Sequence, residues 1–152
     1  MDQQPNGQRA ATTDDLYQRD FYTWANRQAA LLRAGDFAAA DIANIAEEIE
    51  SMGRSEKREL INRLAVLLAH LLKWRFQPEH RSRSWQLTVR EQRLQVSEIL
   101  DDNPGLRSAL PEAVALAYRK AQLIAMRETE LSEETFPAAC PWTFDEAMNM
   151  AL

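Results

Sequence analysis

Apolar residues recur every three to four positions along most of the chain, which is the period of an amphipathic α-helix. No segment of useful length alternates apolar and polar residues as a strand does. Gly and Pro are few and stand at segment boundaries, so they divide this pattern into separate elements. We predict five main helices, from Asp14 or Asp15 to near Gly35, from Asp41 to Gly53 (a stop or a kink), from about Ser55 to Phe76, from Ser82–Ser84 to before Asn103, and from about Pro111 to Glu128.

The two ends of the chain complete the predicted architecture. Thr143 and Glu146 have the spacing of a capping box, which predicts a short last helix. Residues 1–12 are polar and have little to bury, so we expect a flexible N-terminal arm. The predicted fold class is all-α: a single-domain helical bundle over residues 13–152, with four to five main helices and the short C-terminal helix.

The apolar positions of each predicted helix form a stripe that we expect to face the core. The stripe is heavily aromatic on the first helix, and the third helix has an apolar arc wide enough for burial against two or more helices. On the fourth helix, Leu87 and Leu94 lie opposite the main stripe with Arg90 between them, which indicates a second contact surface; the main stripe is Trp85, Val89, Val96, Ile99 and Leu100. The first two stripes are Tyr17, Phe21, Trp24, Gln28, Leu31 and Leu32, then Ile42, Ile45, Ala46, Ile49 and Met52.

Length and cysteine content limit the compartment and the means of stabilisation. A chain of 152 residues is long enough to bury a core without disulfides or metals. Its single cysteine, Cys140, excludes an intramolecular disulfide and fits a reducing compartment. The N-terminus has no signal pattern, and no apolar run approaches the roughly 20 residues of a membrane span. We therefore expect a cytoplasmic protein that does not contact a membrane.

Charge is distributed unevenly along the chain. The net charge is −5, which argues against nucleic-acid binding, but residues 73–93 form a basic belt that could bind phosphate or another anion. The ligand-binding candidates are Lys73, Arg81, Arg83, Trp85 and Arg90, accompanied by His80 and Arg93. The alternative, which we favour because the overall charge is negative, is that these arginines pair with acidic residues, namely Glu47, Glu48 and Glu50 of the second helix and Glu56.

The acidic second helix and the histidines also supply candidates for chemistry. Glu48 and His70 are the catalytic candidates. Together with Glu47 they are weak metal-ligand candidates, in a site that would join the predicted second and third helices. Because the Glu-x-x-His spacing of di-iron bundles is absent, we expect no metal and predict no cofactor.

The remaining reactive or aromatic side chains favour structural roles. Neither histidine is near Cys140 in sequence, which favours a packed thiol over a nucleophile. Trp74 and Trp85 each lie on an apolar stripe, so we expect them to anchor the core. A Gly-rich phosphate loop, HExxH, a CxxC pair and a nucleophile elbow are all absent from the sequence, which lowers the expectation of an enzyme without excluding one.

Several short motifs along the chain carry a family resemblance, each weak alone but specific together. They are Leu16–Trp24, Glu47–Glu56, Leu71–Trp74, Arg81–Trp85, Phe136-Pro137 and Cys140-Pro141. With them the chain resembles, from about Asp14 to Met148, the bacterial family called domain of unknown function 29. The resemblance implies an all-helical bacterial domain, and it brings no activity, substrate or cofactor to particular residues.

These observations favour a protein-interaction or adaptor module, whose partner is an unknown protein or a second copy of the chain. The main alternative is a small helical enzyme or ligand binder that acts on an anionic, phosphorylated substrate through a Glu, His and Arg cluster. Nucleic-acid binding through residues 73–93 is the third reading. The placement of the charges discriminates among these three functions. Arginines paired with the acidic helix would favour an interaction module, whereas a cationic cluster that opens into a pocket with His70 would favour a ligand site.

Overall fold

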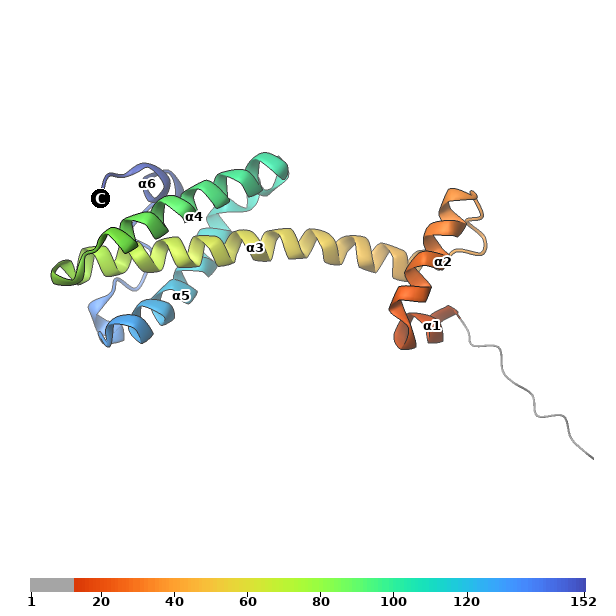
Figure 1. Ribbon diagram of the computed structural model, residues 1–152, viewed down its shortest axis with the longest axis horizontal. Helices are drawn as coiled ribbons and strands as arrows, with labels where there is room; N and C mark the ends of the chain where they lie inside the picture. The colour runs from red at the N-terminus through yellow and green to blue at the C-terminus, as the bar shows by residue number, and fades with distance from the viewer. Residues whose placement is uncertain (1–12) are drawn as a thin grey trace, which may run out of the picture. The chain divides into compact units, whose positions relative to one another are not determined.

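A computed structural model of the protein describes residues 13–152, and every regular element in that range is helical (Figure 1). The all-α fold class is therefore confirmed, while the arm predicted over residues 1–12 lies outside the described residues. The α-helices are α1 (Thr13–Arg19), α2 (Phe21–Arg33), α3 (Ile42–Phe76), α4 (Arg83–Asp102), α5 (Leu110–Thr129) and α6 (Phe144–Asn149), with short 3-10 helices at Pro78–His80, Pro104–Ala109 and Glu133–Thr135.

The described residues divide into two compact units, one that extends to Gly53 and one that comprises residues 54–152. The N-terminal unit holds α1, α2 and the first part of α3, and the C-terminal unit holds the remaining elements. That residues 13–152 form one single domain stays a prediction.

The helices of the N-terminal unit meet around Trp24, whose side chain is almost fully buried. Its indole Nε1 donates a hydrogen bond to Oδ2 of Asp41, at 3.0 Å. The backbone N–H of Asp41 in turn donates to Oε1 of Gln28, at 2.7 Å. Tyr17 packs edge-on against the indole, with ring centroids 4.7 Å apart. These contacts fix α2 to the start of α3 through directional bonds as well as apolar burial.

The predicted first helix is two helices, because Asp20 interrupts it. Asp20 has non-helical dihedrals and acts as the N-cap of α2, where its carboxylate accepts a hydrogen bond from the backbone N–H of Thr23 at 3.0 Å. This bond lowers the pKa of the Asp20 carboxyl group. Helix α2 ends just before Gly35, whose φ of +71° lies in the left-handed region, so the predicted stop near Gly35 is confirmed.

One helix, α3, occupies the region where two helices were predicted. It continues through Gly53, so the stop predicted there is wrong. Gly53 does not have a positive φ, and no atom would lie within 4 Å of an added Cβ. A glycine inside a helix lowers helix stability by only about 1 kcal/mol relative to alanine. The helical turns on either side of Gly53 outweigh this cost.

The core of the C-terminal unit lies between α3, α4 and α5, which run alongside one another (Figure 1). Helix α3 contributes closely spaced leucines, α4 contributes one apolar face, and α5 contributes a row of alanines that allows close approach. Burial of Val89, Val96 and Leu100 confirms that part of the pattern predicted for α4. The fully buried residues include Leu60, Leu64, Leu67, Leu68, Leu71 and Leu72 of α3, Val89, Val96 and Leu100 of α4, and Ala113, Ala117, Ala121 and Ala125 of α5.

The segment after α5 is held against this core by polar contacts. The carbonyl oxygen of Pro137 accepts hydrogen bonds from the Tyr118 hydroxyl, at 2.5 Å, and from Nε2 of Gln122, at 2.9 Å. Helix α6 begins with the predicted capping box. The backbone N–H of Thr143 donates to Oε2 of Glu146 at 2.8 Å, and the N–H of Glu146 donates to the Thr143 hydroxyl at 3.2 Å. The prediction of a short last helix is confirmed.

Candidate functional site

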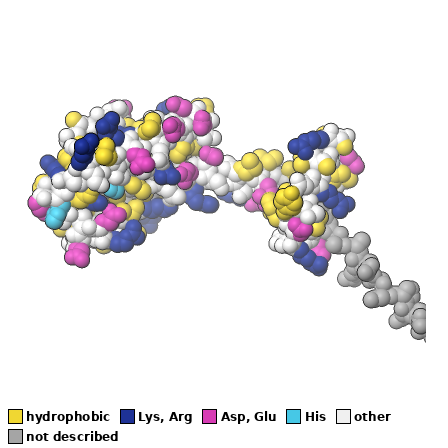
Figure 2. Space-filling model, in the orientation of Figure 1, with side chains coloured by type: hydrophobic (Ala, Val, Ile, Leu, Met, Phe, Trp, Pro, Cys, Tyr) yellow, Lys and Arg dark blue, Asp and Glu magenta, His cyan; other side chains and the backbone are white. Residues whose placement is uncertain are grey.

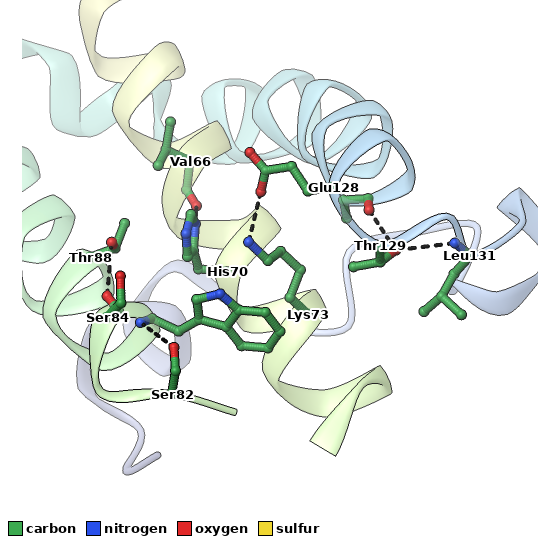
Figure 3. A network of polar contacts seen from close by, with 11 residues as sticks. Val66, His70, Lys73, Ser82, Ser84, Thr88, Glu128, Thr129 and Leu131 are labelled. Carbon is green, nitrogen blue, oxygen red and sulfur yellow. Dashed lines mark hydrogen bonds and ion pairs between the residues drawn. The ribbon is translucent and has the colours of Figure 1, made fainter. Parts of the chain in front are cut away.

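Lys73 is a buried cation at the centre of a polar network on the C-terminal unit (Figure 3). Its Nζ lies 2.7 Å from Oε2 of Glu128 on α5. The same ammonium group lies over the ring of Trp85 on α4, 4.5 Å from the ring centroid. Lys73 thus links α3 to both neighbouring helices, and its charge already has a carboxylate and an aromatic face as partners.

His70 lies one turn before Lys73 and is half-buried (Figure 3). Its Nδ1 donates a hydrogen bond to the carbonyl oxygen of Val66, at 2.9 Å. Burial lowers the pKa of His70, the bond to Val66 opposes that effect, and the charge of Lys73 lowers the pKa further. The lowered pKa favours the neutral imidazole, in which the bond donated by Nδ1 leaves Nε2 as an acceptor.

The other catalytic candidate, Glu48, is held in the N-terminal unit by Tyr17. The Tyr17 hydroxyl donates to Oε1 of Glu48 at 2.5 Å, and this hydrogen bond raises the pKa of Tyr17. Glu48 and His70 belong to the same continuous helix, about six turns apart, rather than to two facing helices. The site hypothesised to join them across two helices is therefore wrong. Within residues 13–152, no three His, Cys, Asp or Glu side chains come together as a metal site would require.

The arginines of the predicted basic belt have separate environments. Nε of Arg81 donates to the carbonyl oxygen of Trp74 at 2.8 Å, and the guanidinium lies 4.9 Å from the centroid of the Trp74 ring. Arg93 also bonds backbone carbonyls, so the favoured pairing with the acidic segment is wrong for these two arginines. The acids have other partners as well, since Glu56 accepts a hydrogen bond from Asn103 at 3.3 Å.

Two candidates of the belt, Arg83 and Arg90, remain together at a pocket. This pocket measures about 380 Å³ and lies between α4 and residues 149–152. Arg93 completes its cationic lining, and its own Nε and Nη2 donate to the carbonyl oxygens of Ala147 and Met150, both at 2.9 Å. His70 and Lys73 are not among the described residues that line it, so the predicted Glu, His and Arg cluster divides into separate sites.

Cys140 and the tryptophans of the basic region have structural surroundings. The Cys140 Sγ donates to the carbonyl oxygen of Trp142 at 3.3 Å, and burial raises the pKa of the thiol, which disfavours the reactive thiolate. These contacts support the packed-thiol reading. Trp74 and Trp85 are only half-buried and each contacts a cation, so the expectation that they anchor the core is wrong.

An open apolar groove on the N-terminal unit was missed by the sequence reasoning. It lies between α2 and the start of α3 and measures about 420 Å³. Four large side chains of its lining are exposed: Phe21 by 50%, Leu32 by 38%, Ile49 by 64% and Met52 by 68%. The stripes that hold them were expected to be buried, which is wrong for these residues. Figure 2 shows apolar side chains at the surface of this unit.

Fold and groove together define an all-α protein that exposes a preformed apolar surface. Residues 16–152 match the family described as "Domain of unknown function DUF29", and the chain belongs to that family, as its motifs predicted. No curated protein matched the chain, and no solved structure did. In the described part of the chain, no helix combines the length and the apolar character needed to cross a membrane.

Proposed function

We propose that this protein is a cytoplasmic protein-interaction module, and that the groove of its N-terminal unit receives an apolar helix of a partner protein. The observation that carries the proposal is the exposure of Phe21, Leu32, Ile49 and Met52 on a single groove. Contiguous exposed apolar surface is characteristic of sites that another molecule covers. The single cysteine supports the cytoplasmic compartment.

The groove has the properties that helix recognition requires. Its two walls are helices, and the side-chain ridges of a third helix can pack between them. The floor is preformed, because the Trp24 indole is fixed by its bond to Asp41. Met52 contributes a flexible thioether that adapts to the partner surface. Glu48 also lines the groove, so a partner helix with a basic residue beside its apolar stripe would complement it.

The experiment is a pull-down with the tagged full chain from its native lysate after nuclease treatment, followed by reconstitution with the purified partner. Ile49→Glu places a charge in the groove and should abolish binding of the stoichiometric partner. Phe37→Glu is the matched control, because Phe37 is an exposed aromatic of the same unit that is not among the described lining residues. Binding that survives in a folded Ile49→Glu variant, or the absence of any stoichiometric partner, contradicts the proposal.

A second candidate function, anion binding, is supported by the pocket of Arg83, Arg90 and Arg93. Guanidinium groups match phosphate geometry. Calorimetric titration with inorganic phosphate tests this candidate. Arg90→Gln should weaken binding, whereas Arg107→Gln, at an exposed arginine paired with Asp101, should leave it unchanged. No heat of binding with the unaltered protein would reject it.

A further inference from the structure

A second groove, on the C-terminal unit, combines an apolar floor with a dense cationic rim. It lies between α3 and α5 and measures about 610 Å³. Among the described residues that line it, five are cationic and none is acidic: Arg54, Lys57, Arg58, Arg119 and Lys120. Because the chain has a net charge of −5, this concentration of positive charge opposes the sign of the protein as a whole.

The floor of this groove consists of Ile61, Leu116 and Leu123. Ile61 is buried, but Leu116 is 38% exposed and Leu123 is 66% exposed. The two leucines are one heptad apart on α5, which corresponds to about 10.5 Å along the helix. They therefore form a short apolar stripe with the spacing that a second helix uses for its own contacts.

The cations stand on both sides of this stripe. Three come from α3, while Arg119 and Lys120 come from α5. One carboxylate is already bound next to the groove, since Lys57 Nζ lies 2.8 Å from Oε2 of Glu112. Lys120 Nζ donates to Oδ1 of Asn62, at 3.1 Å. These contacts show that Lys57 and Lys120 of the rim each bind a side-chain oxygen at the edge of the groove.

We infer that this groove binds an acidic amphipathic helix of a partner protein. Apolar side chains one heptad apart on that helix cover Leu116 and Leu123, and carboxylates that flank its stripe face the cations of α3 and α5. The chemistry differs from that of the N-terminal groove, whose lining contains no Lys or Arg among the described residues. The inference therefore concerns a separate site and does not depend on the proposed function.

Charge and shape favour this occupant over other polyanions. No aromatic ring is among the described lining residues, so bases of a single-stranded nucleic acid have nothing on which to stack. A phosphate group above Leu116 and Leu123 that keeps its hydration shell would leave both leucines exposed to water. A phosphate group that contacts the leucines directly would lose part of its own hydration. A lipid bilayer presents a broad surface, whereas these leucines lie in a groove between two helices.

Fluorescence anisotropy with the full chain tests the inference. The probe is a fluorescein-labelled stapled helix with leucine at heptad spacing and glutamate on both flanks, and a second peptide has lysine in place of each glutamate. The glutamate peptide should bind, with an affinity that falls as salt rises. The double variant Arg119→Glu with Lys120→Glu should lower that affinity at least about tenfold, since like charges then face each other. Arg107→Glu, outside the groove, should retain it.

Three results with the two peptides would overturn the inference. They are no binding of the glutamate peptide, equal binding of the lysine peptide, and an affinity unchanged by the double variant. Tighter binding of phosphatidylglycerol vesicles or of a single-stranded RNA oligonucleotide, lost in the same double variant, would also overturn it. Ile49→Glu should bind the glutamate peptide like the unaltered protein. The peptide measurement therefore tests the groove between α3 and α5 independently of the proposal for the N-terminal groove.

Discussion

Lys73 and Glu128 form an ion pair of which only one partner is buried. Their charged groups are 2.7 Å apart, and the side chains are 6% and 39% exposed, respectively. Lys73 therefore depends on Glu128 for its stability in the fold more than Glu128 depends on Lys73. Without the carboxylate, the ammonium group would be a charge in the protein interior, whereas water can reach the carboxylate if the ammonium is removed.

This asymmetry predicts unequal effects of the two single substitutions. Glu128→Gln should lower the free energy of unfolding by about 2–3 kcal/mol, because the buried charge loses its partner. Lys73→Met should lower it by only about 1 kcal/mol, since methionine fills much of the same volume. Urea unfolding followed by circular dichroism measures both. Glu112→Gln, at the exposed partner of Lys57, is the control and should cost less than about 1 kcal/mol. A larger loss for Lys73→Met than for Glu128→Gln would reject this account.

The half-buried His70 predicts that stability falls on acidification. Its folded pKa lies below the ordinary value of 6.5, mainly because of burial. As the pH falls through 6.5, the unfolded chain therefore binds a proton that the folded protein does not. The contribution of neutral His70 to the free energy of unfolding is fully present above the pKa that His70 has in the unfolded chain. It is lost as the pH falls toward the pKa that His70 has in the folded protein.

Urea midpoints measured from about pH 7.5 down to about pH 5 test this titration. The His70→Gln variant should show a weaker decline than the unaltered protein. His80→Gln, at an exposed histidine, should retain the original decline. Identical pH profiles for the unaltered protein and His70→Gln would exclude His70 as the cause.

Local signals in the sequence were sufficient for most of the fold. Thr143 and Glu146 define a helix start through bonds within four residues, so their spacing alone carries the information. The stripe that includes Val89 and Val96 was also assigned to the correct face. Periodicity identifies an apolar face without identifying what covers it. For that reason the stripe of Ile49 was expected to be buried, although the Ile49 side chain is 64% exposed.

The candidate sites were harder to predict, because neighbours in sequence did not become neighbours in space. Arg81 and Arg93 looked like parts of one belt, but each bonds a different stretch of backbone. Arg58 and Arg119 are far apart in sequence and line the same groove. The parallel course of α3 and α5 through the core brings them together, and no local motif encodes that packing.

Arg93 should hold α6 and the residues after it against α4. It donates to the carbonyl oxygens of Ala147 and Met150, so Arg93→Met removes two charge-assisted bonds and leaves both acceptors without this donor. The free energy of unfolding should fall by about 2 kcal/mol. Hydrogen exchange should accelerate in residues 144–150 first. Arg90→Met removes an exposed arginine of the same helix and should leave exchange there unchanged. Unchanged protection in Arg93→Met would show that apolar packing alone holds the segment.

Gly53 and Gly35 predict opposite responses to the same substitution. Gly53 lies inside α3 without a positive φ, and an added Cβ has no atom within 4 Å. Gly53→Ala should therefore raise the free energy of unfolding by about 0.5–1 kcal/mol, because it reduces the entropy of the unfolded chain. Gly35 also has open space around it, but its φ is +71°, so Gly35→Ala should lower the free energy by about 1 kcal/mol.

Thermal unfolding of the two glycine variants beside the unaltered protein measures both signs. Because the space for a Cβ is open at both positions, the contrast isolates backbone conformation from packing. If Gly53→Ala proves destabilising, the continuous helix at this position is not the state that dominates in solution. In that case Gly53 interrupts the helix, as one of the two alternatives predicted for it, a stop or a kink, requires.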